Sequence, residues 1–289
     1  MVAQVDTTFN YFNEDAGYDL ILGTVQPFRR KVDSQNATAH DIRGHESEFK
    51  LDTHGFELCH HPSKHMDLVN EPDKDIVKKH IYPEIEEVLK KCTGANNALV
   101  FSHVTRNGSP EKIQAQADAS TSDEERTTTA TPARVVHIDQ SAIGANALLE
   151  DNLPADLVTK VKSGRWALIN VWRPLKKIPR DPLAMCDARS VAETDKVELT
   201  ARLPTWSGAK YGASRPSLSA LHVRYNEAHR WYFADEMTED EVWVFKIWES
   251  LDDGSVAGGV AHSSFVDPRT RDVRELRESM EIRSLVWWD

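Results

Sequence analysis

Hydrophobic and polar residues alternate over short stretches along much of this chain, and this two-residue period predicts β-strands. Between residues 18 and 59 it is found in Y-D-L-I-L-G-T-V and in F-K-L-D-T-H-G-F-E-L. Residues 73–92 differ, because their apolar side chains recur at helical spacing. One long helix is therefore expected there, with Asp73 as N-cap and Pro83 as a candidate kink. Its apolar positions are Ile76, Val77, Ile81, Ile85, Val88 and Leu89.

The second half of the chain consists mainly of short stretches rich in Val, Ile, Trp and Tyr, with one short helix expected near residues 154–162. Strands are predicted in R-V-V-H-I-D, W-A-L-I-N-V-W-R-P-L, S-A-L-H-V-R-Y, E-V-W-V-F-K-I-W-E and M-E-I-R-S-L-V-W-W. Many short strands with few helices are typical of an antiparallel barrel or sandwich of jelly-roll type. We predict a mainly β fold with flanking helices, an irregular N-terminal portion, and a single domain over residues 1–289.

Residues 107–132 interrupt this pattern. They contain one Ile and no aromatic residue, so they offer little apolar surface to bury. We interpret the segment as a polar insertion that forms a long solvated loop. The sequence does not decide whether this insertion also covers a site.

Composition and charge exclude several function classes. The net charge is −11, from 35 basic and 46 acidic residues, and an acidic balance without a basic cluster argues against nucleic acid or an anionic membrane as partner. No apolar run reaches the ~20 residues that span a bilayer. Cys59, Cys92 and Cys186 are odd in number and widely spaced, which argues against a disulfide framework and a cysteine-based zinc site. A cytoplasmic enzyme acting on a small molecule is expected.

His137 and Asp139 lie two residues apart in the strand-like stretch A-R-V-V-H-I-D-Q-S. Residues at this spacing project from the same face of a strand, so the imidazole and the carboxylate can be two adjacent ligands of one metal ion. A second histidine from a distant strand would complete the set. Two histidines and one carboxylate leave other coordination positions open and suit non-haem Fe(II). The alternative is a pair of polar residues on a solvated strand.

A candidate for the third ligand lies near the C-terminus. His262 is followed by Arg277 and Ser279, and an arginine and a serine two apart on one strand face can hold a carboxylate. A co-substrate anchored there by a remote carboxylate could reach the metal with its other end. His222, in L-H-V-R-Y-N, is the main rival, but no R-x-S follows it at a useful distance.

Other histidines are weaker candidates. The second H-x-D, at His65 and Asp67, lies outside any strand pattern and is expected in a loop or at a helix start. His54, His60 and His61 have spacings that fit no closed metal site, so we interpret them as surface residues.

Taken together, the H-x-D, the later histidine and the R-x-S resemble Fe(II)/2-oxoglutarate-dependent oxygenases. The chain is most similar to a mainly fungal branch with gibberellin-desaturase-like and aspergillic-acid hydroxylase-like members, related to a cephalosporin-methoxylation component and similar to valine aziridine-forming oxygenases. The resemblance extends from about residue 18 to the C-terminus, without the polar insertion. It is carried by V-V-H-I-D-Q-S, N-V-W-R-P-L, D-P-L-A-M-C-D, W-Y-F-A-D-E-M-T-E-D-E-V-W-V-F-K, A-H-S-S-F-V-D-P and R-E-S-M-E-I-R.

This resemblance implies a double-stranded β-helix (jelly-roll) core and a role in secondary metabolism. It also implies roles for single residues. The iron ligands are His137, Asp139 and His262, and the contacts to the 2-oxoglutarate carboxylate are Arg277 and Ser279. Position in the predicted strands, and not the resemblance, adds Asn170 and Arg283 as candidate contacts to 2-oxoglutarate. It also adds four candidate substrate contacts, which are Arg106, Trp172, Arg173 and Tyr225. For Asn170, Trp172 and Arg173, a buried polar network that supports the site is an equal alternative, and for Tyr225 a place in the core is the more frequent role of such an aromatic residue.

We therefore expect an oxidoreductase that uses Fe(II), 2-oxoglutarate and O2 to hydroxylate, desaturate or cyclise a small molecule, with amino acids among the candidate substrates. Two alternatives remain open. One is a cupin-like metalloenzyme that does not use 2-oxoglutarate, and the other is a non-catalytic partner subunit whose pocket has been filled. The sequence leaves the substrate and the oligomeric state undecided.

Overall fold

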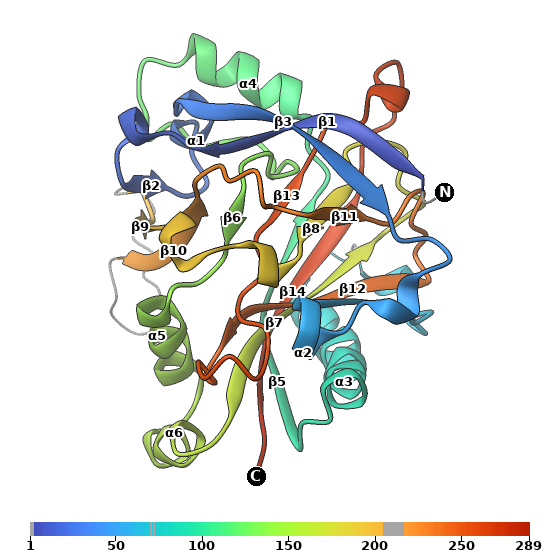
Figure 1. Cartoon of the computed structure of the whole chain (residues 1–289), viewed down its shortest axis with the longest axis vertical. Helices are drawn as coiled ribbons and strands as arrows, with labels where there is room; N and C mark the ends of the chain where they lie inside the picture. The colour runs from blue at the N-terminus through green and yellow to red at the C-terminus, as the bar shows by residue number, and fades with distance from the viewer. Residues whose placement is uncertain (1–2, 70, 72, 205–216) are drawn as a thin grey trace.

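Two β-sheets face one another in the computed structural model of this chain, and a large apolar cluster fills the space between them (Figure 1). The structure describes residues 3–69, 71, 73–204 and 217–289. The larger sheet has nine strands in the order β1-β3-β11-β8-β13-β6-β10-β9-β2, and the smaller has five in the order β4-β12-β7-β14-β5. The prediction of a mainly β fold is confirmed.

The larger sheet is mixed, because β11 pairs parallel with β3 and β2 pairs parallel with β9. Its strands are β1 (Gln4–Phe12), β2 (Asp19–Ile21), β3 (Val32–Asp41), β6 (His137–Ile138), β8 (Leu183–Cys186), β9 (Lys196–Arg202), β10 (Ser217–Val223), β11 (Trp231–Phe233) and β13 (His262–Ser264). The smaller sheet is antiparallel throughout. Its strands are β4 (Phe56–His60), β5 (Asn97–Arg106), β7 (Trp166–Pro174), β12 (Glu241–Glu249) and β14 (Ser279–Trp287).

Helices lie outside the two sheets. They are α1 (Gln26–Arg29), α2 (Leu51–His54), α3 (Lys74–Thr93), α4 (Pro110–Ala119), α5 (Ala142–Asn152) and α6 (Ala155–Lys162). The long helix and the short helix expected near 154–162 are both confirmed. As predicted, the Asp73 side chain caps α3 by accepting a hydrogen bond from the Asp75 amide, and the helix ends at Gly94, which has a φ of 68° that glycine adopts without strain.

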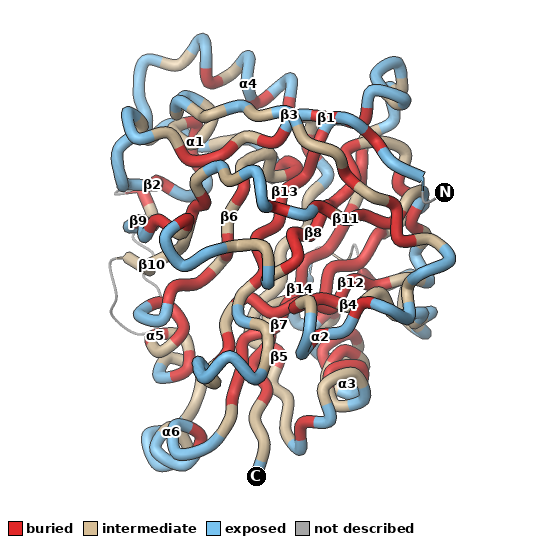
Figure 2. The backbone as a smooth tube through the Cα atoms, viewed as in Figure 1, coloured by how far each residue is buried: buried red, intermediate tan, exposed pale blue. Residues whose placement is uncertain are grey.

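Buried residues gather along the central strands, whereas exposed residues lie on the outer loops and helices (Figure 2). Side-chain alternation along the strands sorts this core into layers. On β7, Leu168 and Trp172 face the larger sheet, whereas Ile169 and Val171 face α3. The same rule places Asn170 on the face that looks toward the larger sheet. The strand is buried along its whole length, so both of its faces contribute to the core.

The prediction of an irregular N-terminal portion was wrong. Residues 4–12 form β1, which pairs with β3 along its full length, and its buried positions alternate as in a strand with one buried face. This strand also supports the chain just before β6. Asn10 donates from Nδ2 to the Arg134 carbonyl and accepts from the Val136 amide, both at 2.8 Å.

The polar insertion also differs from its prediction as a solvated loop. Its first half forms α4, capped by Ser109, and Ile113 and Ala117 are buried one turn apart on the same helix face. The Ala117 carbonyl accepts a hydrogen bond from Arg29 Nε on α1 at 2.8 Å. Three buried residues, Pro110, Ile113 and Ala117, together with these polar contacts, dock the helix, although the average composition of the segment is polar.

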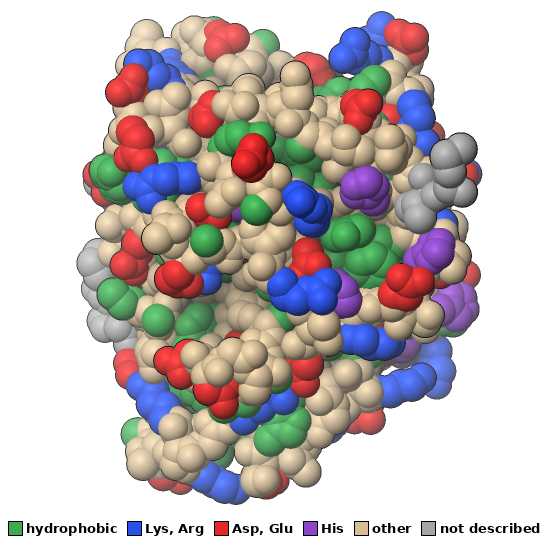
Figure 3. Space-filling model, in the orientation of Figure 1, with side chains coloured by type: hydrophobic (Ala, Val, Ile, Leu, Met, Phe, Trp, Pro, Cys, Tyr) green, Lys and Arg blue, Asp and Glu red, His purple; other side chains and the backbone are tan. Residues whose placement is uncertain are grey.

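The surface carries no long apolar element. Among the described residues, no helix combines the length and hydropathy required to cross a membrane. On the face shown in Figure 3, acidic and basic side chains are interspersed.

We expect Ile85→Ala to lower the free energy of unfolding by about 2–5 kcal/mol, the usual loss for truncating a buried aliphatic side chain. Ile85 is fully buried between α3 and the smaller sheet. Urea denaturation of both forms measures the difference. Lys79→Ala, on the exposed side of α3, serves as the control and should change stability by less than about 0.5 kcal/mol. Equal stability of the two variants would contradict the assigned packing.

Candidate metal centre

Two neighbouring strands of the larger sheet carry a histidine each at the same level. His137 begins β6, His262 begins β13, and the two residues pair directly across the strands. Their ring centroids are 4.3 Å apart. Gly259 permits the close approach of these strands, because a Cβ at this position would lie 2.8 Å from Ile138 Cγ2 and 2.9 Å from the Ile247 carbonyl oxygen.

Asp139 follows β6 and completes a group of three potential ligands whose donor atoms lie within 4.8 Å of one another. Asp139 Oδ1 is 3.4 Å from His137 Nε2 and 4.0 Å from His262 Nε2. The Nδ1 atoms of the histidines face the Val135 and Val260 carbonyl oxygens at 2.7 and 3.1 Å. These contacts orient each Nδ1 as a donor, so each Nε2 is the nitrogen turned toward the space shared with Asp139, where a neutral imidazole offers its free electron pair to a cation.

The charges of this group suit a cation. Burial raises the pKa of Asp139, but the Arg283 guanidinium and the two histidines outweigh it and hold that pKa well below its usual range. Burial, and then the charge of His137, lower the pKa of His262 to about 4. The pKa of His137 is raised, because the hydrogen bond and charge of Asp139 outweigh the effect of burial. At neutral pH the carboxylate is therefore ionised and the His262 imidazole is neutral.

The smaller sheet holds the other oxygen of Asp139. Asn170 Nδ2 on β7 donates to Asp139 Oδ2 at 2.7 Å, and Arg283 Nε on β14 lies 3.5 Å from the same atom. Asn170 and Arg283 pair in register on adjacent strands, so both approach from one side. Because Asn170 and Arg283 hold Oδ2, Oδ1 is the oxygen that faces the histidines and remains available for a metal ion. Phe245 on β12 closes the group from the same sheet, with its ring centroid 4.8 Å from that of His262.

A transition metal fits this arrangement. His262 Nε2 and Asn170 Oδ1 are buried polar atoms without a hydrogen-bond partner in the described structure, although such atoms are normally paired. Two imidazole nitrogens and one carboxylate oxygen on one side of a space form the ligand set of facial non-haem Fe(II) sites. No other group of three such residues was found among the described residues.

Ser279 begins β14, the next strand in the chain after His262, and Arg277 lies two residues before it. Both are buried, and Arg277 Nε and Ser279 Oγ have no hydrogen-bond partner in the part of the chain that the structure describes. Burial, and then the positive charge of Arg106, lower the pKa of Arg277 to about 9. A buried guanidinium with an unused N–H beside an unused hydroxyl is the arrangement that an anionic ligand would satisfy.

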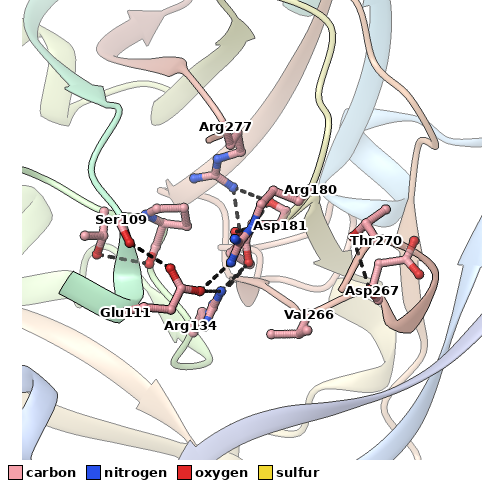
Figure 4. A network of polar contacts seen from close by, with 12 residues as sticks. Ser109, Glu111, Arg134, Arg180, Asp181, Val266, Asp267, Thr270 and Arg277 are labelled. Carbon is pink, nitrogen blue, oxygen red and sulfur yellow. Dashed lines mark hydrogen bonds and ion pairs between the residues drawn. The ribbon is translucent and has the colours of Figure 1, made fainter. Parts of the chain in front are cut away.

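The guanidinium of Arg277 is fixed on one side by the protein (Figure 4). Its Nη1 donates to the Asp181 carbonyl oxygen at 2.7 Å and lies 3.2 Å from Ser264 Oγ. Trp172 lies below it, with its ring centroid 5.3 Å from the guanidinium carbon. Trp172 therefore lies on the same face of β7 as Asn170, as strand alternation predicts. There it packs against the Arg277 guanidinium.

Charged side chains continue along the same face of β14. Glu281 is buried between the guanidinium groups of Arg283, at 2.6 Å, and Arg106, at 3.7 Å. Arg106 also donates to the Thr131 carbonyl oxygen. The sequence analysis did not identify Glu281 as a site residue. Residues 279, 281 and 283 alternate along one strand, so the same-face rule that placed Ser279 with Arg283 would also have placed Glu281 there.

Arg173 is not brought to this site, contrary to its proposed role as a substrate contact. It lies on the opposite face of β7 from Trp172 and is buried. Its Nη2 donates to the His61 carbonyl oxygen at 3.0 Å, and its Nη1 donates to the Glu239 carbonyl oxygen at 3.2 Å. Strand alternation sends its side chain outward, and Pro174 does not reverse it.

Tyr225 is also absent from the site. It is 40% exposed and packs edge-on against Tyr11, which belongs to the apolar cluster on the other side of β6. His222 pairs in register with His137 but packs edge-on against Phe12 and is not one of the grouped ligands. Met66 and Asp67, next to His65, form a short 3-10 turn, as expected for the second H-x-D.

Comparison with known proteins agrees with the family suggested by the motifs. A family model described as an oxidoreductase/YMDC permease-like domain matches residues 9–287. The hydroxylase/desaturase efuI of Hormonema carpetanum is 39% identical, over 99% of this chain and 95% of that protein. The hydroxylase/desaturase CTB9 of Cercospora beticola is 35% identical, over 98% and 87%. The alpha-ketoglutarate-dependent dioxygenase tstK of Talaromyces stipitatus is 30% identical, over 86% and 83%.

Among solved structures, the iron and alpha-ketoglutarate-dependent endoperoxidase NvfI superimposes with a TM-score of 0.79, over 99% of this chain and 98% of that one. The two sequences are 22% identical, so the likeness concerns the fold. It confirms the predicted jelly-roll core.

We expect Asn170→Ala to weaken divalent metal binding by about ten- to a hundredfold, the range found when partners behind metal ligands are removed. The reason is that Asp139 Oδ2 loses its donor and the carboxylate can rotate. Titration with Co(II), followed by visible absorbance, measures the affinity. Ser263→Ala is the control, since its hydroxyl donates to the Ser264 carbonyl oxygen. Unchanged affinity in Asn170→Ala would show that Asp139 does not need this support.

Proposed function

The chain belongs to the oxidoreductase family of the fungal hydroxylase/desaturases, and on this premise we propose that it is an Fe(II)- and 2-oxoglutarate-dependent oxygenase that oxidises a small molecule of secondary metabolism. The observation that supports this most directly is the meeting of His137, Asp139 and His262 from separated parts of the chain. The proposed setting is the cytoplasm, where its three free cysteines would remain reduced.

His137, Asp139 and His262 would hold the iron on one side through two Nε2 atoms and Oδ1. Bound iron and 2-oxoglutarate would together activate O2 and supply the oxidant that removes hydrogen from a C–H bond. Asn170 and Arg283 would keep Asp139 ionised and turned toward the metal. The hydrogen bonds of both Nδ1 atoms to main-chain carbonyls keep each imidazole in the tautomer that can bind a cation.

Arg277 and Ser279 would hold the far carboxylate of 2-oxoglutarate through the free Nε and Oγ. Both atoms are buried and lack partners, and a charge-assisted hydrogen bond from a buried arginine is strong. This pair of unused donors favours a 2-oxoglutarate enzyme over a cupin-like metalloenzyme that uses the metal alone. The apolar residues around Phe245 would keep water from the reaction.

The substrate would approach from the side of the site that solvent reaches. The side chains of His137 and Arg283 are 19% and 31% exposed, whereas that of His262 is 3% exposed. Arg106, 20% exposed, lies at the same side and is retained as a proposed substrate contact.

Oxidation coupled to 2-oxoglutarate is tested by oxygen consumption and succinate formation in the presence of Fe(II), 2-oxoglutarate and a panel of small organic molecules. We expect substrate-dependent succinate from the wild type and less than about 1% of it from His137→Ala, since a facial site loses one of three protein ligands. His65→Ala, in the other H-x-D, should retain wild-type turnover. Metal uptake without succinate would favour the cupin-like alternative, and the absence of metal uptake would favour a non-catalytic subunit.

We expect Arg277→Ala to raise the KM for 2-oxoglutarate by about ten- to a hundredfold, the cost of losing hydrogen bonds to a charged group. The concentration dependence of succinate formation measures this change. Arg274→Ala, which removes an exposed arginine three positions earlier in the chain, is the control. An unchanged KM in Arg277→Ala would reassign the anion contact.

A further inference from the structure

Asp181 begins the stretch D-P-L-A-M-C-D, and neither the metal centre nor the proposed carboxylate contacts use its side chain. It has a φ of 54°, in the left-handed region that Asp and Asn tolerate better than most residues. Its side chain is 2% exposed. A strained and buried acidic residue beside a site calls for a specific role.

The main-chain carbonyl of Asp181 faces the proposed cofactor arginine. It accepts hydrogen bonds from Arg277 Nη1 at 2.7 Å and from Ser264 Oγ at 2.9 Å. Ser264 lies two residues after His262 on β13, so the same strand supports the metal centre and this carbonyl. Nη1 is thus held by the protein, whereas Nε is buried without a hydrogen-bond partner among the described residues, as is Ser279 Oγ two positions along the chain.

The carboxylate of Asp181 is locked by two arginines (Figure 4). Arg134 lies 2.5 Å from Oδ1, and Arg180 Nε lies 2.8 Å from Oδ2. Both arginines also contact Glu111 on α4, Arg180 by a short ion pair and Arg134 at 3.5 Å. A chain of contacts therefore runs from α4, through two arginines and Asp181, to Arg277.

We propose that Asp181 is a positioning residue for 2-oxoglutarate binding, because it fixes the direction of the Arg277 guanidinium. Glu111 connects α4 to Asp181 through the two arginines that hold the Asp181 carboxylate. The inference rests on the proposed function. The ion pairs of the carboxylate hold the left-handed turn in place, and that turn aims the carbonyl at Nη1. A released turn would leave Arg277 free to rotate, and its Nε would lose alignment with Ser279.

Asp267 offers a matched comparison within the same region. Its carboxylate is also 2% exposed and is paired with one arginine, Arg269, and it caps the following 3-10 turn. Among the described residues, its carboxylate accepts hydrogen bonds from the amide and the guanidinium of Arg269 and not from Arg277. Substitution of Asp267 removes a buried carboxylate paired with an arginine, whereas substitution of Asp181 also removes the support of Arg277. Comparing the two substitutions separates these effects.

The test compares Asp181→Asn with Asp267→Asn. Asn tolerates the left-handed turn, so the substitution removes the charge with little change in shape. Anaerobic titration of the Mn(II)-loaded proteins with 2-oxoglutarate measures the dissociation constant, and Mn(II) affinity and thermal unfolding are measured in parallel. We expect Asp181→Asn to raise the dissociation constant for 2-oxoglutarate about tenfold, with Mn(II) affinity unchanged, and Asp267→Asn to leave both constants unchanged.

Wild-type 2-oxoglutarate affinity in folded Asp181→Asn, or an equal loss in both variants, would overturn the positioning role. Failure of the wild-type protein to bind 2-oxoglutarate would instead overturn the proposed function.

The coupling of α4 is tested with Glu111→Gln, which also covers the case in which Asp181→Asn does not fold. Glu111 is 55% exposed, so we expect a smaller rise in the dissociation constant, about two- to threefold, that disappears at high salt. Asp118→Asn is its control, because Asp118 lies on the same helix and accepts a hydrogen bond from Gln114 of that helix. Identical behaviour of Glu111→Gln and Asp118→Asn would overturn the coupling.

Discussion

The hydrogen bond between Asn170 and Asp139 is the contact on which the site depends, because it joins the two facing sheets at the metal centre. The larger sheet brings both histidines and the aspartate together through strand pairing. The smaller sheet takes one oxygen of that aspartate and leaves the other for a ligand. Neither sheet builds the site alone, so the packing of one sheet on the other sets its geometry.

Charge balance distinguishes the charged groups that the protein itself compensates from those that require a ligand of opposite charge. Arg283 lies between the carboxylates of Glu281 and Asp139, and its charge is compensated by the protein. Arg277 is more deeply buried than Arg283, but its Nη1 donates to a carbonyl oxygen and a hydroxyl, neither of which carries a charge. An isolated buried cation is costly, and the unused donors of Arg277 and Ser279 indicate where an anionic cofactor would compensate it. The group of His137, Asp139 and His262 has the opposite requirement, for a cation.

The sequence predicted those parts of the molecule that depend on local periodicity. The helix at residues 74–93, the mainly β character and the shared face of His137 and Asp139 all follow from spacing between near neighbours. Strand alternation also places Asn170 with Trp172 and opposite Arg173, and the structure follows that alternation. The errors arose where average composition was used in place of position. Val5, Phe9 and Tyr11 alternate within a polar stretch of β1, and Pro110, Ile113 and Ala117 are buried on α4.

By itself, the sequence determined the kinds of chemical group available and which of them share a strand face, because backbone geometry fixes those relations within a few residues. It also supported His262 over His222 through the R-x-S that follows. Only the tertiary structure decided that His262 pairs with His137, that Asn170 supports Asp139, and that Asp181 supports Arg277. These contacts join residues far apart in the chain, and their distances are set by strand register and sheet packing, which no local pattern encodes.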